Sequence, residues 1–247
     1  MSAPPPVALV TGGARRLGAA IVRRLHAAGY AVAVHCRTST ADAHALAAEL
    51  EAARPAGVLV LEADLARFDA LPELVARTVG HFGRLDALVN NAAAFFPTPA
   101  GTVTPAQWDT LLATNLRAPF FLSQAAAPHL KATRGAILNI SDVYARQPRG
   151  DLSAYAISKG GLEATTRALA VALAPEVRVN AIAPGAILWP EDAPDPALQA
   201  RILASTALGR IGDVEEIAAT ALWLLRDARY TTGSVVSVDG GRTPLGE

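Results

Sequence analysis

Short apolar runs alternate with segments of helical character along almost the whole chain. Buried strands of parallel sheets read as continuous hydrophobic runs, and helices between such strands cover both faces of the sheet. The pattern therefore predicts an α/β fold: one Rossmann-type doubly wound parallel sheet of seven strands with helices on both faces. The seven expected strands are Val7–Val10, Tyr30–His35, Gly57–Leu61, Leu85–Asn90, Gly135–Ile140, Val177–Ile182 and Ser234–Val238.

Helices are expected between these strands, and two segments depart from a simple helical pattern. Pro119 lies inside the segment from Pro105 to Leu130 and predicts a bend or a second helix start there. Residues 186–206 contain Pro190, Pro194 and Pro196 and show no strand period, so we interpret them as a substrate lid loop. The remaining expected helices end at Ala28 or cover about 41–53, Ala70–Phe82, Ser153–Leu173 and Val214–Leu225.

Composition limits the class of protein. A chain of 247 residues with 51% hydrophobic residues is predicted to form one domain over 1–247. The 22 basic and 22 acidic residues cancel without a basic stripe, which excludes nucleic acid and membrane surfaces as expected partners. One cysteine, no signal-like N-terminus and no apolar run of about 20 residues predict a cytoplasmic protein. The five histidines lack metal-ligand spacing, so no metal is expected.

Two turns suggest a dinucleotide. The turn Thr11–Gly18 lies between the first strand and a helix, where free backbone N–H groups and the helix dipole form an anion site. An ordinary strand–helix turn is the alternative. The segment His35–Ser39 contains Arg37 but no acid, so it suits the 2′-phosphate of NADPH, unless Arg37 is simply solvated.

Tyr155 and Lys159 stand four residues apart in a helical segment. This spacing places both side chains on one helix face, where the ammonium is expected to lower the tyrosine pKa from about 10. A phenol with a lowered pKa suits proton transfer near neutral pH. Asp142 follows the fifth strand and is either part of this site or a helix-capping residue.

Together these residues resemble the short-chain dehydrogenase/reductase family over essentially the whole chain. The motifs are Thr11-Gly12 through Gly18, Asp64-Leu65, Asn90-Asn91-Ala92, Asn115, Tyr155 with Lys159, Pro184-Gly185 and Val238–Gly241. The resemblance implies a homotetramer formed through the long helix after Asp151. It also implies that NADPH or NADP contacts Thr11, Gly12, Arg15, Arg16, Leu17, Gly18, His35, Arg37, Thr38, Ser39, Asp64, Leu65, Asn91, Ala92, Tyr155, Lys159, Pro184 and Gly185.

Two departures from the usual family pattern are similar to the pteridine reductase branch. Arg16 stands where glycine is usual, and Asp142 stands where the catalytic serine is usual. The match to this branch implies that Phe95 stacks on a pterin, although Ala93 replaces a serine often found there. The implied substrate contacts are Arg16, Phe95, Asp142, Tyr155, Leu188 and Trp189. Phe95 as a core aromatic and Trp189 as a packing anchor are the alternatives.

An aspartate in place of serine changes which substrate fits. An ionised carboxylate would repel the alkoxide that develops from a ketone, but it can accept hydrogen bonds from the ring N–H and amino groups of a pterin. If it is protonated, it can instead supply a proton to a reduced C=N nitrogen. Burial would raise the Asp142 pKa, whereas Lys159 would lower it.

The resulting hypothesis is NADPH-dependent reduction of a pterin or folate C=N bond, catalysed by Asp142, Tyr155 and Lys159. Family resemblance implies that Asn115 supports a water or lysine relay, while a buried structural amide is the alternative. Two other functions stay open: a reductase of a carbonyl, such as a 3-oxoacyl thioester or small ketone, and a catalytically silent dinucleotide-binding sensor or scaffold. The presence of Asn115, Tyr155 and Lys159 together argues against the silent protein.

Overall fold

The computed structural model describes residues 4–189 and 195–242. Its sheet has seven strands in the order β3-β2-β1-β4-β5-β6-β7, and every neighbouring pair is parallel. This confirms the predicted doubly wound α/β fold. The strands are β1 Val7–Val10, β2 Ala31–Cys36, β3 Val58–Glu62, β4 Ala87–Asn90, β5 Ala136–Ile140, β6 Arg178–Pro184 and β7 Val235–Val238.

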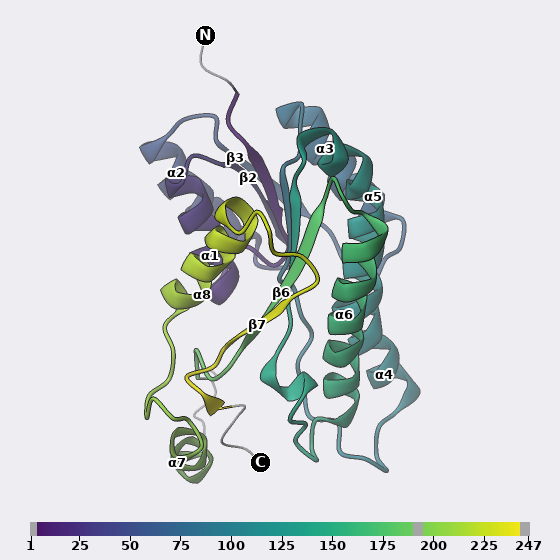
Figure 1. Cartoon of the computed structure of the whole chain (residues 1–247), viewed down its shortest axis with the longest axis vertical. Coiled ribbons are helices and arrows are strands. Elements are labelled where there is room, and N and C mark those ends of the chain that lie inside the picture. The colour runs from purple at the N-terminus through teal and green to yellow at the C-terminus, as the bar shows by residue number, and fades with distance from the viewer. Residues whose placement is uncertain (1–3, 190–194, 243–247) are drawn as a thin grey trace.

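Two helical layers cover the sheet, one on each face (Figure 1). The first layer is α1 (Arg16–Ala27), α2 (Thr40–Ala53) and α8 (Val214–Leu222), and the second is α3 (Ala70–Phe82), α5 (Ala118–Thr133) and α6 (Ser153–Ala172). Successive side chains of a strand point to opposite faces. Accordingly, Ala8 and Val10 of β1 join the apolar core beneath α1 and α8, whereas Val7 and Leu9 join the core beneath α3 and α5. Strands buried on both faces explain the continuous apolar runs.

The expected helix from Pro105 to Leu130 consists of three segments. A π-helical turn, Ala113–Arg117, separates α4 (Pro105–Leu112) from α5. Pro119 lies in the first turn of α5, directly after this π-helical turn. The backbone stays helical at Leu112, Arg117 and Ala118, so the three segments form one continuous helix and Pro119 does not mark a separate helix start. The π turn carries Asn115, and such turns are frequent at functional sites.

The interpreted lid contains a helix that we did not predict. α7 covers Pro196–Ala204 within residues 186–206. The Asp195 carboxylate accepts a hydrogen bond from the Ala197 N–H at 2.9 Å, and Pro196 occupies the first helical turn. An aspartate cap followed by proline is a helix-start signal, so the sequence did contain the information. Pro190 and Pro194 lie outside the described residues.

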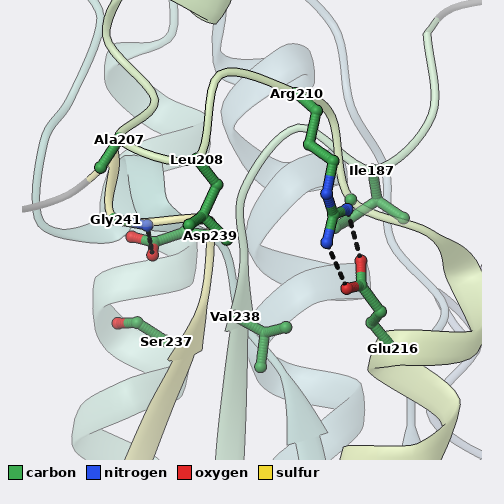
Figure 2. A pocket seen from close by; sticks show the side chains of 11 residues that line it. Ile187, Ala207, Leu208, Arg210, Glu216, Ser237, Val238, Asp239 and Gly241 are labelled. Carbon is green, nitrogen blue, oxygen red and sulfur yellow. Dashed lines mark hydrogen bonds and ion pairs between the residues drawn. The ribbon is translucent and has the colours of Figure 1, made fainter.

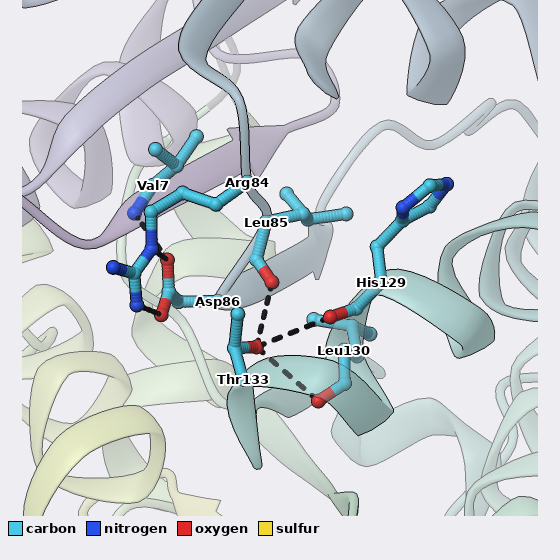
Figure 3. Close-up of polar contacts among 7 residues, drawn as sticks. All are labelled: Val7, Arg84, Leu85, Asp86, His129, Leu130 and Thr133. Carbon is cyan, nitrogen blue, oxygen red and sulfur yellow. Dashed lines mark hydrogen bonds and ion pairs between the residues drawn. The ribbon is translucent and has the colours of Figure 1, made fainter. Parts of the chain in front are cut away.

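At the end of the sheet where β1 and β4 begin, polar contacts join these two strands to the end of α5 (Figure 3). The Asp86 carboxylate accepts from the Val7 N–H at 2.8 Å and pairs with Arg84 at 2.6 Å. The Thr133 hydroxyl donates to the Leu85 carbonyl at 2.7 Å. These contacts satisfy backbone groups that the hydrogen bonds between strands leave unpaired. We therefore assign them a role in stabilising the fold.

Within the described ranges, no helix is long and apolar enough to cross a membrane. The same part of the chain holds no group of three or more histidine, cysteine, aspartate or glutamate side chains suited to a metal ion.

Candidate active site

A cavity of about 470 Å³ lies at the carboxyl ends of β1, β2 and β4. Ligands of doubly wound sheets bind beyond the carboxyl ends of the strands. The cavity brings together most of the residues predicted to contact the cofactor, namely Gly12, Arg15, Arg16, Leu17, Gly18, His35, Arg37, Thr38, Ser39, Asp64, Leu65, Asn91 and Ala92. The predicted Thr11, Tyr155, Lys159, Pro184 and Gly185 are not among its lining residues. Ala14, Cys36, Ala93, Ala94 and Thr114 line it and were not predicted to contact the cofactor.

The glycine turn is packed too tightly for other residues at two positions. Gly12 has a φ of +60°, and a Cβ there would lie 2.9 Å from the Ala92 Cα. A Cβ on Gly18 would lie 2.1 Å from the Gly12 carbonyl oxygen. At the start of α1, Arg15 makes no side-chain hydrogen bond to the first N–H groups of the helix. These features suit a bound pyrophosphate.

Polar side chains hold this turn in place. The Asn91 amide donates to the carbonyls of Thr11 and Gly12, both at 2.9 Å. His35 Nδ1 accepts from the Gly12 N–H at 3.2 Å, which assigns the proton to Nε2, 3.1 Å from the Ala63 carbonyl. Burial lowers the pKa of His35 and keeps the ring neutral. His35 therefore joins the glycine turn, through Nδ1, to the segment that follows β3, through Nε2.

The catalytic candidates meet where β5 ends beside α6. The Tyr155 hydroxyl donates to Asp142 Oδ2 at 2.8 Å, although the two residues are thirteen positions apart. Asp142 Oδ1 accepts from the Tyr144 N–H at 2.9 Å, because Asp142 also caps the short 3₁₀ turn Val143–Ala145. The Lys159 ammonium donates to the Ile140 carbonyl at 2.7 Å. Asp142 is thus both a cap and a partner of Tyr155, so the two interpretations of this residue are compatible.

The pKa of Tyr155 is shifted in the direction opposite to the one we expected. Burial raises the pKa of Tyr155 well above its ordinary value, and the Asp142 carboxylate raises it further. We expected Lys159 to lower this pKa, but its Nζ is directed at the Ile140 carbonyl and lies 5.9 Å from the centre of the tyrosine ring. Tyr155 is therefore a protonated hydrogen-bond donor in this structure.

Asp142 and Lys159 are shifted toward their neutral forms. Burial raises the pKa of Asp142, opposed by hydrogen bonds from Tyr144 and Tyr155 and by the positive charges of Lys159 and Arg242. Burial lowers the pKa of Lys159 to about 8, opposed by the negative charge of Asp142. A carboxyl group shifted in this direction can release and take up a proton closer to neutral pH than an exposed aspartate.

Asn115 joins the π turn to the neighbouring loop and to α6. Its side-chain oxygen accepts from the Ala94 N–H at 2.8 Å, and its amide donates to the Ala94 carbonyl and to the Ser158 hydroxyl, both at 3.0 Å. The buried side chain uses both of its N–H groups in these contacts. The structure thus places Asn115 as a buried, hydrogen-bonded amide beside α6, and its role in a relay stays a prediction.

Of the side chains predicted to contact substrate, Phe95 and Asp142 contact Tyr155, and Arg16 contacts the backbone of Trp189. Phe95 is 54% exposed, so it is not a core aromatic. Its ring stands at 87° to that of Tyr155, with 4.9 Å between the centroids. Arg16, which has a φ of 51°, donates to the Trp189 carbonyl at 3.2 Å and so joins the glycine turn to the start of the lid. Leu188 beside it is 42% exposed.

A second cavity of about 340 Å³ lies beyond the end of β7 (Figure 2). Arg210 and Glu216 form a two-pronged ion pair at one side, with a shortest distance of 2.7 Å. At the other side, the Asp239 carboxylate accepts from the Gly241 N–H at 2.9 Å. The family motif Val238–Gly241 and Ile187 of the predicted lid line this cavity, but none of the residues predicted to contact the cofactor or the substrate does.

The fold, the glycine turn at a helix N-terminus and the Tyr–Lys pair define a dinucleotide-binding oxidoreductase. A family profile described as enoyl-(acyl carrier protein) reductase matches residues 12–243. The chain belongs to the short-chain dehydrogenase/reductase family, as its motifs predicted.

Individual relatives cover nearly the full chain. It is 39% identical over 243 residues to a Streptomyces violaceoruber protein named as a ketoacyl reductase of the granaticin polyketide synthase, covering 96% of this chain and 95% of the relative. It is 35% identical over 276 residues to pteridine reductase 1 of Leishmania tarentolae, covering 96% of each. Among solved structures, a blue fluorescent protein from a metagenomic library in complex with NADPH is 36% identical, with a TM-score of 0.90 over 96% of this chain and 97% of that one.

The lowered pKa of Lys159 predicts a particular pH dependence of stability. Unfolding returns this pKa from about 8 to its ordinary value of 10.5, so between these values the unfolded chain binds more protons. At pH 7 the buried charge of Lys159 lowers the free energy of unfolding. This loss is recovered as pH rises through the window, because the folded protein can release the proton there. The free energy of unfolding of the wild type, measured relative to that of Lys159→Met, should therefore rise by up to about 1.4 kcal/mol per pH unit. Urea unfolding of the ligand-free proteins across this pH window measures the difference. A difference that stays flat or falls across the window would contradict the assignment.

Proposed function

We propose that this protein is an NADPH-dependent pteridine reductase, which reduces C=N bonds of dihydropterin or dihydrofolate-type substrates. The observation that carries the proposal is the hydrogen bond of 2.8 Å between the Tyr155 hydroxyl and Asp142, at the position where the family usually has a serine. The exposed ring of Phe95 beside Tyr155 supports it further. The relative named pteridine reductase 1 is consistent with this choice.

The residues that line the larger cavity fit NADPH. Gly12 and Gly18 allow the close backbone approach that a pyrophosphate needs, and the uncapped start of α1 favours a negative group. Arg37 lies with Thr38 and Ser39 at the end where a 2′-phosphate would bind. The NADPH complex of the blue fluorescent protein supports the same cofactor. When bound, NADPH supplies a hydride to a ring carbon.

The side chains of this chain then have to deliver a proton to the ring nitrogen and hold the ring. Asp142 is suited to both tasks, because its raised pKa permits a neutral carboxylic acid and its carboxylate accepts from N–H donors. Tyr155 donates a hydrogen bond to the same carboxyl and so stabilises the carboxylate that remains after the transfer. Lys159 contributes positive charge that favours ionised Asp142 after the transfer. Phe95 offers an exposed aromatic face for a flat heterocycle.

Reduction of a carbonyl is the second candidate function, supported by the ketoacyl reductase relative at 39% identity. At Asp142 the two functions make opposite demands. A ketone oxygen needs a hydrogen-bond donor as negative charge develops on it, which a carboxylate cannot supply. A pterin presents N–H donors, for which a carboxylate is the better partner. The substrate preference therefore depends on one side chain.

Variants of Asp142 test the proposal. Asp142→Asn keeps the shape but cannot ionise, so turnover of dihydropterin should fall about 100-fold or more while NADPH binding is retained. Asp142→Ser restores the usual family residue and should raise the ratio of acetoacetyl-thioester turnover to dihydropterin turnover. Both are measured by NADPH oxidation, with NADH as the comparison reductant and NADPH affinity by fluorescence titration.

Full dihydropterin activity in Asp142→Asn would remove the argument. A wild-type protein that prefers the acetoacetyl thioester would favour the carbonyl function, and tight NADPH binding without turnover of a pterin, folate, quinone or carbonyl would favour a silent sensor or scaffold.

The proposal includes a homotetramer. Apolar side chains are exposed on the two helices of one layer: Phe120 on α5 at 36%, and Ile157 and Val171 on α6 at 53% and 81%. Burying such side chains between subunits would remove them from water. Light scattering of the purified protein should give the mass of four 25.5 kDa chains. A mass of one chain at micromolar concentration would contradict this.

A further inference from the structure

One face of α6 contacts the last residue of β5 and the loop that follows it. Tyr155, Lys159 and Glu163 are spaced by four residues and therefore share this face. Tyr155 bonds to the Asp142 carboxylate, and Lys159 bonds to the carbonyl of Ile140. The function described above uses the first two of these helix residues. Glu163, the third, is left without a task.

Glu163 binds both ends of the segment that carries Asp142. Its carboxylate accepts from the Ser141 hydroxyl at 3.2 Å, directly before Asp142. It also accepts from the Arg146 guanidinium at 3.3 Å, directly after the 3₁₀ turn that Asp142 caps. The two oxygens are used separately, Oε1 by Ser141 and Oε2 by Arg146. The carboxylate thus spans the loop on which the catalytic aspartate stands.

The surroundings of Glu163 make this arrangement more than a surface ion pair. Glu163 is 5% exposed, whereas the Arg146 side chain is 38% exposed. A carboxylate this deeply buried is destabilising unless it is well paired, and removal of either partner leaves the other uncompensated. Arg146 also donates to the Ser237 hydroxyl of β7 at 3.4 Å. The loop of Asp142 is therefore fixed between α6 and the edge strand of the sheet.

A second arginine provides a matched control. Arg167 lies one helical turn beyond Glu163 and approaches the same oxygen only to 3.9 Å, and its side chain is 57% exposed. An exposed pair at this distance contributes little. Arg167 balances the charge of Glu163 without touching the loop of Asp142, so it separates a charge effect from a positioning effect.

We propose that Glu163 is a positioning residue of the active site, which holds Asp142 in register with the Tyr155 hydroxyl through Ser141 and Arg146. The proposal rests on the role of Asp142 in the proposed function. Glu163 touches neither the Tyr155 hydroxyl nor the Asp142 carboxyl, and it acts on the reaction only by fixing the loop. Loss of this support should allow Asp142 to move, and small displacements of reacting groups have large effects on rate.

A double-mutant cycle tests the proposal. Glu163→Gln should lower kcat about 10-fold or more without changing NADPH affinity, whereas Arg167→Gln should leave kcat unchanged. Once Asp142 has been replaced by Asn, Glu163→Gln should cause no further loss, because the residue it positions is already inactive. A merely structural role would instead multiply the two losses. The cycle is measured with whichever acceptor the wild type reduces, so failure with dihydropterin refutes the pteridine function and not this proposal.

Crystal structures of the NADP complexes provide a readout that needs no activity. In Glu163→Gln the distance from Asp142 to the Tyr155 hydroxyl should exceed hydrogen-bonding range, compared with 2.8 Å in the parent chain. An unchanged distance together with unchanged kcat would overturn the proposal, as would multiplied losses in the cycle. If Glu163→Gln does not fold, Ser141→Ala takes its place, because it removes the contact at 3.2 Å and leaves the buried carboxylate paired with Arg146.

Discussion

The hydrogen bond of 2.8 Å from the Tyr155 hydroxyl to Asp142 is the contact on which the proposed chemistry depends. It exists because α6 packs beside the end of β5, so that residues thirteen positions apart become neighbours. Burial there works on both groups in the same direction, since it raises the pKa of Asp142 and that of Tyr155. Both groups consequently release their protons at higher pH than exposed side chains of the same type, which for Asp142 suits a reaction that must protonate a nitrogen.

The site consists of two parts built by different means. The part that fits a dinucleotide is made mainly of backbone: a turn that only glycine can form at Gly12 and Gly18, held by Asn91 and His35. The proposed catalytic part is made of side chains on one helix, α6, and on the short loop after β5. Asn115 on the π turn connects α6 to the loop before Phe95, so the ring proposed to stack on the substrate and the proposed proton donors share one support.

The sequence was sufficient for the strands and for most of the cofactor cavity, because buried parallel strands and glycine turns impose local patterns. It was insufficient where distant contacts decide. The pKa of Tyr155 depends on where Lys159 points and on the charge of Asp142, neither of which helical spacing reveals. Glu163 looks like one more charged residue on a helix until its burial is known. α7 was missed for another reason, since its aspartate–proline start was visible but was read as part of a loop.

Occupancy of the site by ligand tests the central claim most directly. In a crystal structure with NADP and a dihydropterin, the account predicts the Asp142 carboxyl within hydrogen-bonding distance of ring nitrogen or amino groups, and the ring stacked on Phe95. A pterin bound elsewhere, or one held in the site with Asp142 turned away from it, would contradict the account. Either result would favour the carbonyl reductase function instead.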